Sequence, residues 1–120
     1  MTKKKQQKKP PQTEKREFVK HDAEKNMLHL LPTVAIERVG EVLTFGAKKY
    51  AAHGWRTVDN RSRYYAAVLR HLMAWNRGED MDPESGLRHL AHACCSLMFL
   101  LEAEDSSLGA DDRPHRATPK

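Results

Sequence analysis

A nearly continuous apolar segment in the second half of the chain most constrains how the chain can fold. Residues 78 to 104 have the sequence GEDMDPESGLRHLAHACCSLMFLLEAE, an acidic loop followed by a helical pattern that is apolar almost all round. A polar strip with Ser85, His89, His92 and Ser96 lies roughly opposite a wide apolar stripe, which comprises Leu87, Leu90, Ala91, Cys94, Leu97, Met98 and Leu101. Such a helix is typical of the inside of a bundle, where the two histidines need water, a metal or a ligand as partner.

Two earlier segments also have helical periodicity, and none has convincing strand alternation. Residues 33 to 51 carry one apolar face with Ile36, Val39, Leu43, Ala47 and Tyr50. Residues 61 to 77 are expected to bury Tyr65, Val68, Leu69, Leu72 and Met73, with small residues beside His71 on the other face. The third helix is expected to begin with Asp82 as its cap and to run to about Glu104. We therefore predict an all-α fold, a helical bundle of three principal helices that is completed by dimerisation.

The two ends of the chain differ in composition from the middle. Residues 1 to 17 form a Lys-rich tail, and residues 106 to 120 are polar without periodicity, so we expect both to be disordered around one domain at residues 18 to 105. The first twenty residues contain eight Lys/Arg and two acidic residues, a balance of +6 in a chain of net charge +5. The basic charge therefore belongs to the tail, which predicts at most weak binding of nucleic acid.

Composition also limits where the protein functions. No window offers eighteen apolar residues and no secretory signal is present, so we expect a soluble cytoplasmic protein that does not bind a membrane. The two cysteines, Cys94 and Cys95, are adjacent, which excludes a CxxC metal pair and disfavours a disulfide. Core packing in a reducing compartment is their expected role.

Two carboxylates on the first helix are candidate metal ligands. Glu37 and Glu41 are four residues apart, so they lie one above the other and can share a hard cation such as Mg²⁺. Lys48 continues the same polar stripe, where it can meet a phosphate. The alternative is a solvated helix face, on which such pairs are common.

Three histidines are the second group of candidates. His89 and His92 are three residues apart and project from one helix face, and His71 offers a third imidazole from another helix. Histidines with carboxylates suit Mn²⁺ or Co²⁺ as well as zinc. The alternative is that these side chains only form structural hydrogen bonds.

Two loops carry further candidates. Asp82 and Glu84 precede the third helix, where capping and the helix dipole explain them, so as metal ligands they rank below Glu37 and Glu41. The same loop lacks the glycine and the final glutamate of an EF-hand. Trp55 and Arg56 can stack on a base and meet a phosphate, or the Trp can pack on the bundle.

Long phrases of the sequence resemble a known family. The phrases LLPTVAIERVGEVLTFGAKKYAAHGW and RYYAAVLRHLMAWNRGEDMDPESGLRHLAHACCSLMFLLE, in this order, are similar to phage dATP/dGTP diphosphohydrolases over residues 20 to 104. More distantly, the chain resembles the all-α MazG-like nucleoside triphosphate pyrophosphohydrolases. It departs from their EExxE and ExxD acids, because Arg70-His71 and His89 with His92 stand at the comparable places, and residues 22 to 25 read DAEK where related chains have D-x-G-K.

The resemblance implies metal-dependent hydrolysis of dATP or dGTP to monophosphate and diphosphate, which would adjust the dNTP pool during phage infection. The expected cofactor is Mg²⁺, or else Mn²⁺ or Co²⁺, and the expected partners are the (d)NTP and a second copy of the chain or more. The candidate catalytic residues are Glu37, Glu41, His71, His89 and His92. The candidate substrate-binding residues are Lys48, Lys49, Trp55, Arg56 and Arg70. The candidate metal ligands are Glu37, Glu41, Asp82, Glu84, His89 and His92.

Two other functions remain open from the sequence. The chain can be a non-enzymatic helical accessory protein that binds nucleic acid through its basic arm. It can also be a triphosphohydrolase of the HD type, although His71 is followed by Leu72 and the adjacent His-Asp pair is missing.

Overall fold

The computed structural model describes residues 24 to 115. The chain divides after Leu31 into two units. Of the first unit, the described part contains a short 3-10 helix, η1, at Leu28–Leu30. The predictions for residues 1 to 17 and for the last five residues lie outside the described part.

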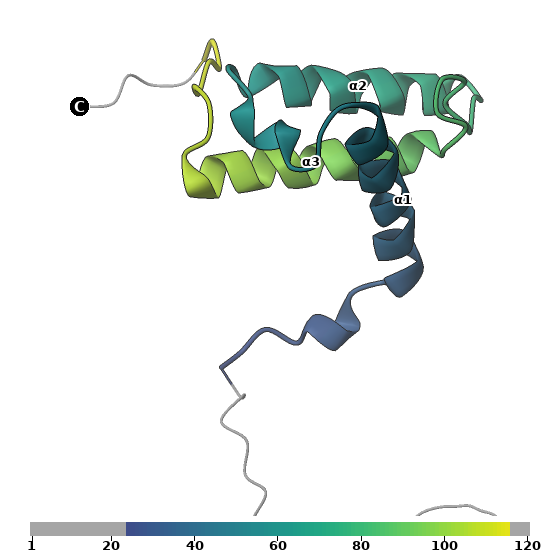
Figure 1. The fold of residues 1–120 in the computed structure, drawn as a ribbon, viewed down its shortest axis with the longest axis horizontal. Helices are drawn as coiled ribbons and strands as arrows, with labels where there is room; N and C mark the ends of the chain where they lie inside the picture. The colour runs from purple at the N-terminus through teal and green to yellow at the C-terminus, as the bar shows by residue number, and fades with distance from the viewer. Residues whose placement is uncertain (1–23, 116–120) are drawn as a thin grey trace, which may run out of the picture. The chain divides into compact units, whose positions relative to one another are not determined.

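Three α-helices and one more 3-10 helix make up the described part of the second unit. They are α1 at Thr33–Lys49, η2 at Gly54–Thr57, α2 at Ser62–Asn76 and α3 at His89–Ser106. Helices α2 and α3 run side by side in opposite directions, and α1 crosses α3 near the end where residues 77 to 88 connect the pair (Figure 1). Between residues 24 and 115 there are isolated β-bridges but no strand, which confirms the all-α prediction.

Helix α3 begins at His89, seven residues after Asp82, which the sequence analysis had expected to cap it. The intervening segment closes on itself, because the backbone N–H of Asp82 donates to the Leu87 carbonyl at 2.7 Å and that of Gly86 donates to the Asp82 carbonyl at 2.7 Å. Gly86 has φ +72°, a left-handed conformation that interrupts a right-handed helix. The prediction of Asp82 as the helix cap was therefore wrong, and its carboxylate is available for another role.

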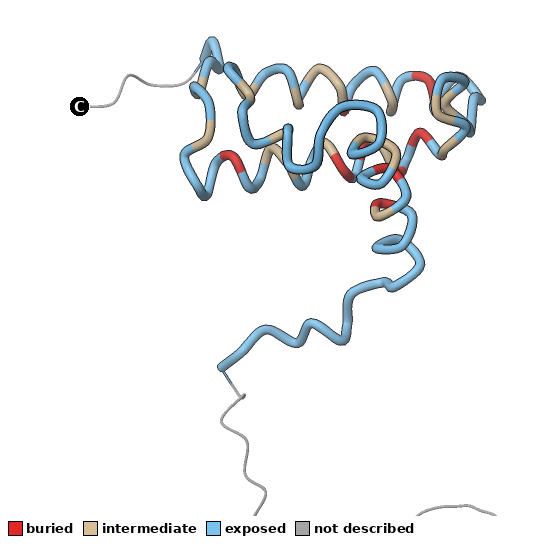
Figure 2. Tube along the Cα trace, in the orientation of Figure 1, coloured by how far each residue is buried: buried red, intermediate tan, exposed pale blue. Residues whose placement is uncertain are grey.

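The faces of the helices that form the core agree only in part with those expected, since Val39, Val68 and Ala91 are buried as predicted. The core contains Val39, Val42, Ala91 and Cys95, with Leu87 and Phe99 packed against it. On α2 and α3, Val68, Ala74, Ala93 and Ala103 are buried as well. Small side chains let two helix backbones approach closely. The polar strip of α3 therefore lies inside the bundle, where His89 is only 4% exposed. Buried positions gather where the helices meet (Figure 2).

Many of the large apolar side chains that were predicted to be buried remain exposed. On α3, Leu97 is 50% exposed and Leu101 66%, and on α2 Tyr65 is 58% and Met73 56% exposed. Cys94 is exposed, whereas Cys95 is buried, and both are free thiols. No helix within residues 24 to 115 is both long enough and apolar enough to cross a membrane. An exposed apolar stripe on α3 is compatible with self-association, and the dimer stays a prediction.

The chain after α3 folds back onto the start of α2. The backbone N–H of Arg61 donates to the Ala110 carbonyl at 3.0 Å, and that of Ser62 donates to Asp112 Oδ1 at 3.0 Å. Gly109 has φ +68°, and a Cβ there would meet the Val58 carbonyl oxygen at 2.9 Å, so only glycine fits. The hydrogen-bonded part of the chain thus extends to Asp112, beyond the boundary at Asp105 that the sequence suggested.

Candidate functional site

A cavity of about 510 Å³ opens between the C-terminal half of α1, the following loop, and one side of α2 and α3. Its lining includes five aromatic residues: Phe45, Tyr50, Trp55, Tyr64 and Phe99. It also includes polar residues, among them Lys49, His71, Asp82, Glu84 and His92. This size lies within the range of sites for small molecules and cofactors, and the combination suits a ligand with an apolar ring and a charged end.

Two histidines and one aspartate meet at the polar part of the site. The Nδ1 atoms of His71 on α2 and His89 at the start of α3 are 2.9 Å apart. With a carboxylate oxygen of Asp82, one ligand atom from each of the three residues lies within 4.8 Å of the others. Within residues 24 to 115 this is the group of His, Cys, Asp and Glu side chains that could hold a metal ion. We call His71, Asp82 and His89 the histidine–aspartate cluster.

Glu79 fixes the orientation of the His89 ring. Its Oε1 atom lies 2.8 Å from His89 Nε2. An ionised carboxylate only accepts hydrogen bonds, so Nε2 carries the proton and Nδ1 of His89 presents its lone pair to His71. A carboxylate behind a histidine is the arrangement that commonly orients metal ligands in proteins.

Ser85 connects Asp82 to His92. Its backbone N–H and its hydroxyl each donate to Asp82 Oδ2 at 3.0 Å. The hydroxyl oxygen accepts the Leu87 N–H at 3.1 Å and lies 2.7 Å from His92 Nε2, which then acts as the donor. Burial alone would raise the pKa of Asp82, but the two hydrogen bonds from Ser85 outweigh it, and the pKa lies below its ordinary value. Asp82 is therefore ionised at neutral pH.

His71 and His92 are neutral at neutral pH. Burial, together with the neighbouring His92 and His89, lowers the pKa of His71 to about 4. Burial also lowers the pKa of His92, against the attraction of Asp82. The His71 and His92 rings stack with centroids 4.6 Å apart. A neutral imidazole is the form that binds a metal or accepts a proton.

The structure also places two predicted substrate-binding residues at the cavity. Lys49 forms an ion pair with Glu84, and its ammonium lies 5.7 Å from the Phe45 ring centroid. The Trp55 ring stacks on Phe99 with centroids 4.7 Å apart, and the Arg56 guanidinium lies 5.2 Å from the Trp55 ring centroid. Trp55 therefore packs on the bundle and also lines the cavity, and its stacking on a base stays a prediction.

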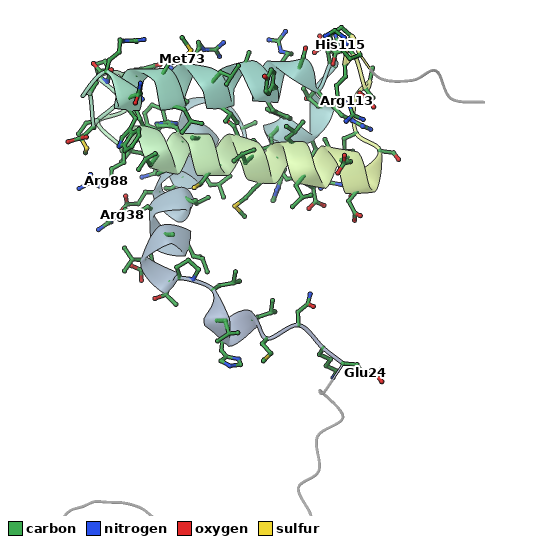
Figure 3. All side chains as sticks on the ribbon, turned by 180° about the vertical axis from the view of Figure 1, so that it is seen from behind. Glu24, Arg38, Met73, Arg88, Arg113 and His115 are labelled. Carbon is green, nitrogen blue, oxygen red and sulfur yellow. The ribbon has the colours of Figure 1, made fainter. Side chains whose placement is uncertain are left out.

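The predicted carboxylate stripe on α1 lies apart from this cavity. Neither Glu37 nor Glu41 lines it, and Glu41 Oε2 forms an exposed ion pair of 2.6 Å with Arg38. Arg38 projects outward from α1 (Figure 3). Lys48 and Arg70 are also exposed and do not line the cavity. The assignment of these four residues as catalytic, metal or substrate residues stays a prediction. Arg70 is adjacent in the sequence to His71 of the histidine–aspartate cluster, whereas Glu37 and Glu41 belong neither to that cluster nor to the cavity lining.

Sequence reasoning missed three residues of the site. Glu79 and Ser85 form hydrogen bonds within it, and Phe99 provides part of the aromatic wall. Ser85 gave a signal, because it falls on the same polar strip as His89 and His92. Glu79 gave none, because its contact with His89 depends on how the loop between α2 and α3 folds.

The similarity of the chain to known proteins extends over most of its length. The sequence model of the family described as "dATP/dGTP diphosphohydrolase, N-terminal" matches residues 15 to 113. A protein of Salmonella phage PMBT28 named dATP/dGTP diphosphohydrolase is 35% identical over 95 residues, which are 79% of this chain and 32% of that protein. The chain thus spans about a third of the length of this relative. No solved structure matches. The resemblance to MazG-like enzymes stays a prediction, whereas the match over most of the chain shows that it belongs to the dATP/dGTP diphosphohydrolase N-terminal family.

Proposed function

We propose that this chain hydrolyses purine deoxynucleoside triphosphates, dATP or dGTP, to the monophosphate and diphosphate with the help of a divalent metal. In a phage-infected cell this reaction would adjust the dNTP pool. The observation that carries the proposal is one cavity with an aromatic wall and with His71 and Asp82 of the histidine–aspartate cluster in its polar lining. Membership of the family supports the substrate class, which is the one named for the phage relative.

The cavity has the parts that a nucleotide requires. A purine offers an aromatic face, which can lie against the wall that Trp55 and Phe99 form. Lys49 lines the same cavity and can neutralise phosphate oxygens when these displace Glu84 from its ammonium. The base and the phosphates are thereby directed to different parts of the cavity.

The residues present fit a divalent cation. Two imidazoles and a carboxylate converge within 4.8 Å, so His71, His89 and Asp82 would hold the ion. When bound, such an ion lowers the pKa of a water molecule and neutralises phosphate charge. The protein needs no nucleophilic side chain for this chemistry. His92 lines the cavity in its neutral form and can accept a proton at the ring nitrogen that is not bonded to Ser85.

The test is to identify the products. The chain is incubated with each of the four dNTPs and with Mg²⁺, Mn²⁺ or Co²⁺, and the products are separated by ion-exchange chromatography. We expect dAMP or dGMP with diphosphate, and slower turnover of the pyrimidine nucleotides. Deoxynucleoside with triphosphate would show a different reaction, and no turnover with any combination would contradict the proposal.

The aromatic wall gives a second measurement. Replacing Trp55 by Ala should raise KM for the preferred purine nucleotide about tenfold, since stacking on an aromatic side chain contributes about 1–3 kcal/mol per base. The exposed Trp75→Ala variant is the matched control, because Trp75 does not line the cavity. Equal KM values for both variants would remove Trp55 from the binding site.

The nucleic-acid alternative depends on residues 1 to 17, which lie outside the described part of the chain. It stays a prediction.

A further inference from the structure

We infer that the histidine–aspartate cluster is a nitrogen-rich site that binds Mn²⁺ or Co²⁺ in preference to Mg²⁺, and that Glu79 is the residue that positions it. The inference rests on the proposed function for what the ion does. The binding itself is a property of the chain without nucleotide, so it can be measured separately.

The donor atoms determine the class of metal. Two of the three candidate ligands are imidazole nitrogens, those of His71 and His89, and only Asp82 contributes oxygen. Mg²⁺ prefers an octahedral shell of oxygen atoms and gives up its water molecules reluctantly. Imidazole suits first-row transition metals, whose affinity for nitrogen sites rises from Mn²⁺ to Co²⁺ and beyond.

The two nitrogens already face each other in the metal-free chain. The Nδ1 atoms of His71 and His89 are 2.9 Å apart, the spacing of a hydrogen bond. The ligand atoms of His71, His89 and Asp82 all lie within 4.8 Å of one another. An ion bound here would therefore replace the hydrogen bond between the two rings and would be held by two nitrogens and one oxygen.

Glu79 holds His89 in the orientation and tautomer of a metal ligand before any metal binds. The His89 side chain is buried, and its Nε2–H donates to Glu79 Oε1 at 2.8 Å. This hydrogen bond holds the tautomer in which Nδ1 has a lone pair directed at the cluster. In the metal-free chain, His71 therefore donates its own Nδ1–H to His89, and an ion takes the place of that shared proton. Loss of such an outer carboxylate commonly weakens metal affinity about 10- to 100-fold.

The experiment is isothermal titration calorimetry of the full chain, made without a polyhistidine tag and stripped with a chelator, with MnCl₂ or MgCl₂ as the only added ligand. We expect one Mn²⁺ per chain and at least tenfold weaker binding of Mg²⁺.

Variants separate the ligands from their support. His71→Ala should abolish Mn²⁺ binding, and Glu79→Gln should weaken it about 10- to 100-fold. The matched control is Glu104→Gln on the exposed far part of α3, which should bind within twofold of the unmodified chain. Circular dichroism confirms that each variant folds, and His71→Gln replaces His71→Ala if the latter does not.

Two results would overturn the inference: Mg²⁺ binding as tight as Mn²⁺ binding, or Mn²⁺ binding that survives His71→Ala. Its failure can be told apart from failure of the proposed function. Selective Mn²⁺ binding without hydrolysis of any dNTP leaves the inference standing and removes the function. Hydrolysis that requires Mg²⁺, with no preference for Mn²⁺ in the titration, leaves the proposed function standing and removes the inference.

Discussion

The carboxylate stripe on α1 and the histidine–aspartate cluster present the same kind of signal in the sequence and opposite surroundings in the structure. Glu37 and Glu41 share a helix face, as do His89 and His92. Glu41 forms an ion pair with the exposed Arg38 of the same helix. His89, by contrast, is buried and contacts His71 and Glu79, which come from other parts of the chain. Spacing along one helix places two groups on one face, but convergence from several elements makes a site.

The comparison is sharpest in activity. His89→Ala and Asp82→Asn should each lower kcat/KM for the preferred dNTP at least about a hundredfold, since removal of one well-placed catalytic contact commonly has this effect. Glu37→Gln and Glu41→Gln should stay within about twofold, because neither residue lines the cavity. Steady-state rates at saturating metal provide the measurement.

The four variants also serve as controls for one another. Circular dichroism must show the same helix content in all of them, so that a lost activity reports on the site and not on the fold. The opposite pattern, in which the glutamate variants are inactive and the His89 and Asp82 variants active, would return the site to the carboxylate stripe.

Hydrophobic periodicity was sufficient to predict the three helices. It did not predict the start of the third helix or all of the buried faces, which depend on tertiary packing. The start of α3 was misplaced because the Asp82–Leu87 turn depends on the positive φ of Gly86, which leaves no periodic trace. The core faces were predicted only in part, because size was taken as the measure of burial, while the small Ala74 and Ala93 pack the helices closely. Asp82 was ranked below Glu37 and Glu41 as a metal ligand because it was expected to cap the third helix, which begins at His89 instead.

The candidate site was predictable in its residue types but not in its geometry. His71, His89, His92, Asp82, Lys49 and Trp55 were all named from the sequence, and the structure brings them to one region. The meeting of His71 with His89 requires that α2 and α3 run antiparallel at close range, and the Glu79 contact requires the loop between them. Both are properties of three-dimensional packing and have no signature in spacing along the chain.

Acidification gives a second, smaller difference between the two regions. The pKa of His71 in the folded chain is about 4, below the value of about 6.5 in an unfolded chain. The unfolded state therefore binds more protons between these values, and the free energy of unfolding rises with pH across this window. The contribution is fully present above about pH 6.5 and is lost as the pH falls towards 4. The lowered pKa of His92 acts in the same direction.

Urea unfolding of the chelator-treated chain at about pH 7 and about pH 5 measures this effect. We expect a lower midpoint at the acidic pH. His71→Gln should reduce the difference between the two midpoints, while His29→Gln, in the unit that ends at Leu31, should leave it unchanged. Equal midpoints at both pH values for the unmodified chain would show that the buried histidines do not stay neutral.

Self-association is expected to have the smallest effect on activity, and it decides whether the carboxylate stripe has a role at all. The apolar stripe of α3 exposes Leu90, Leu97, Met98 and Leu101, a surface that a second copy of the chain can cover. In analytical ultracentrifugation we expect the unmodified chain to sediment as a dimer and the Leu97→Glu variant as a monomer. The kcat/KM of this monomer should lie within about threefold of that of the unmodified chain, because the histidine–aspartate cluster is complete in one chain. A monomeric unmodified chain would contradict the dimer prediction. If the monomeric variant folds but is inactive, a neighbouring copy supplies part of the active site. Glu37 and Glu41 are exposed in a single chain, so they would be the first residues to test as that contribution.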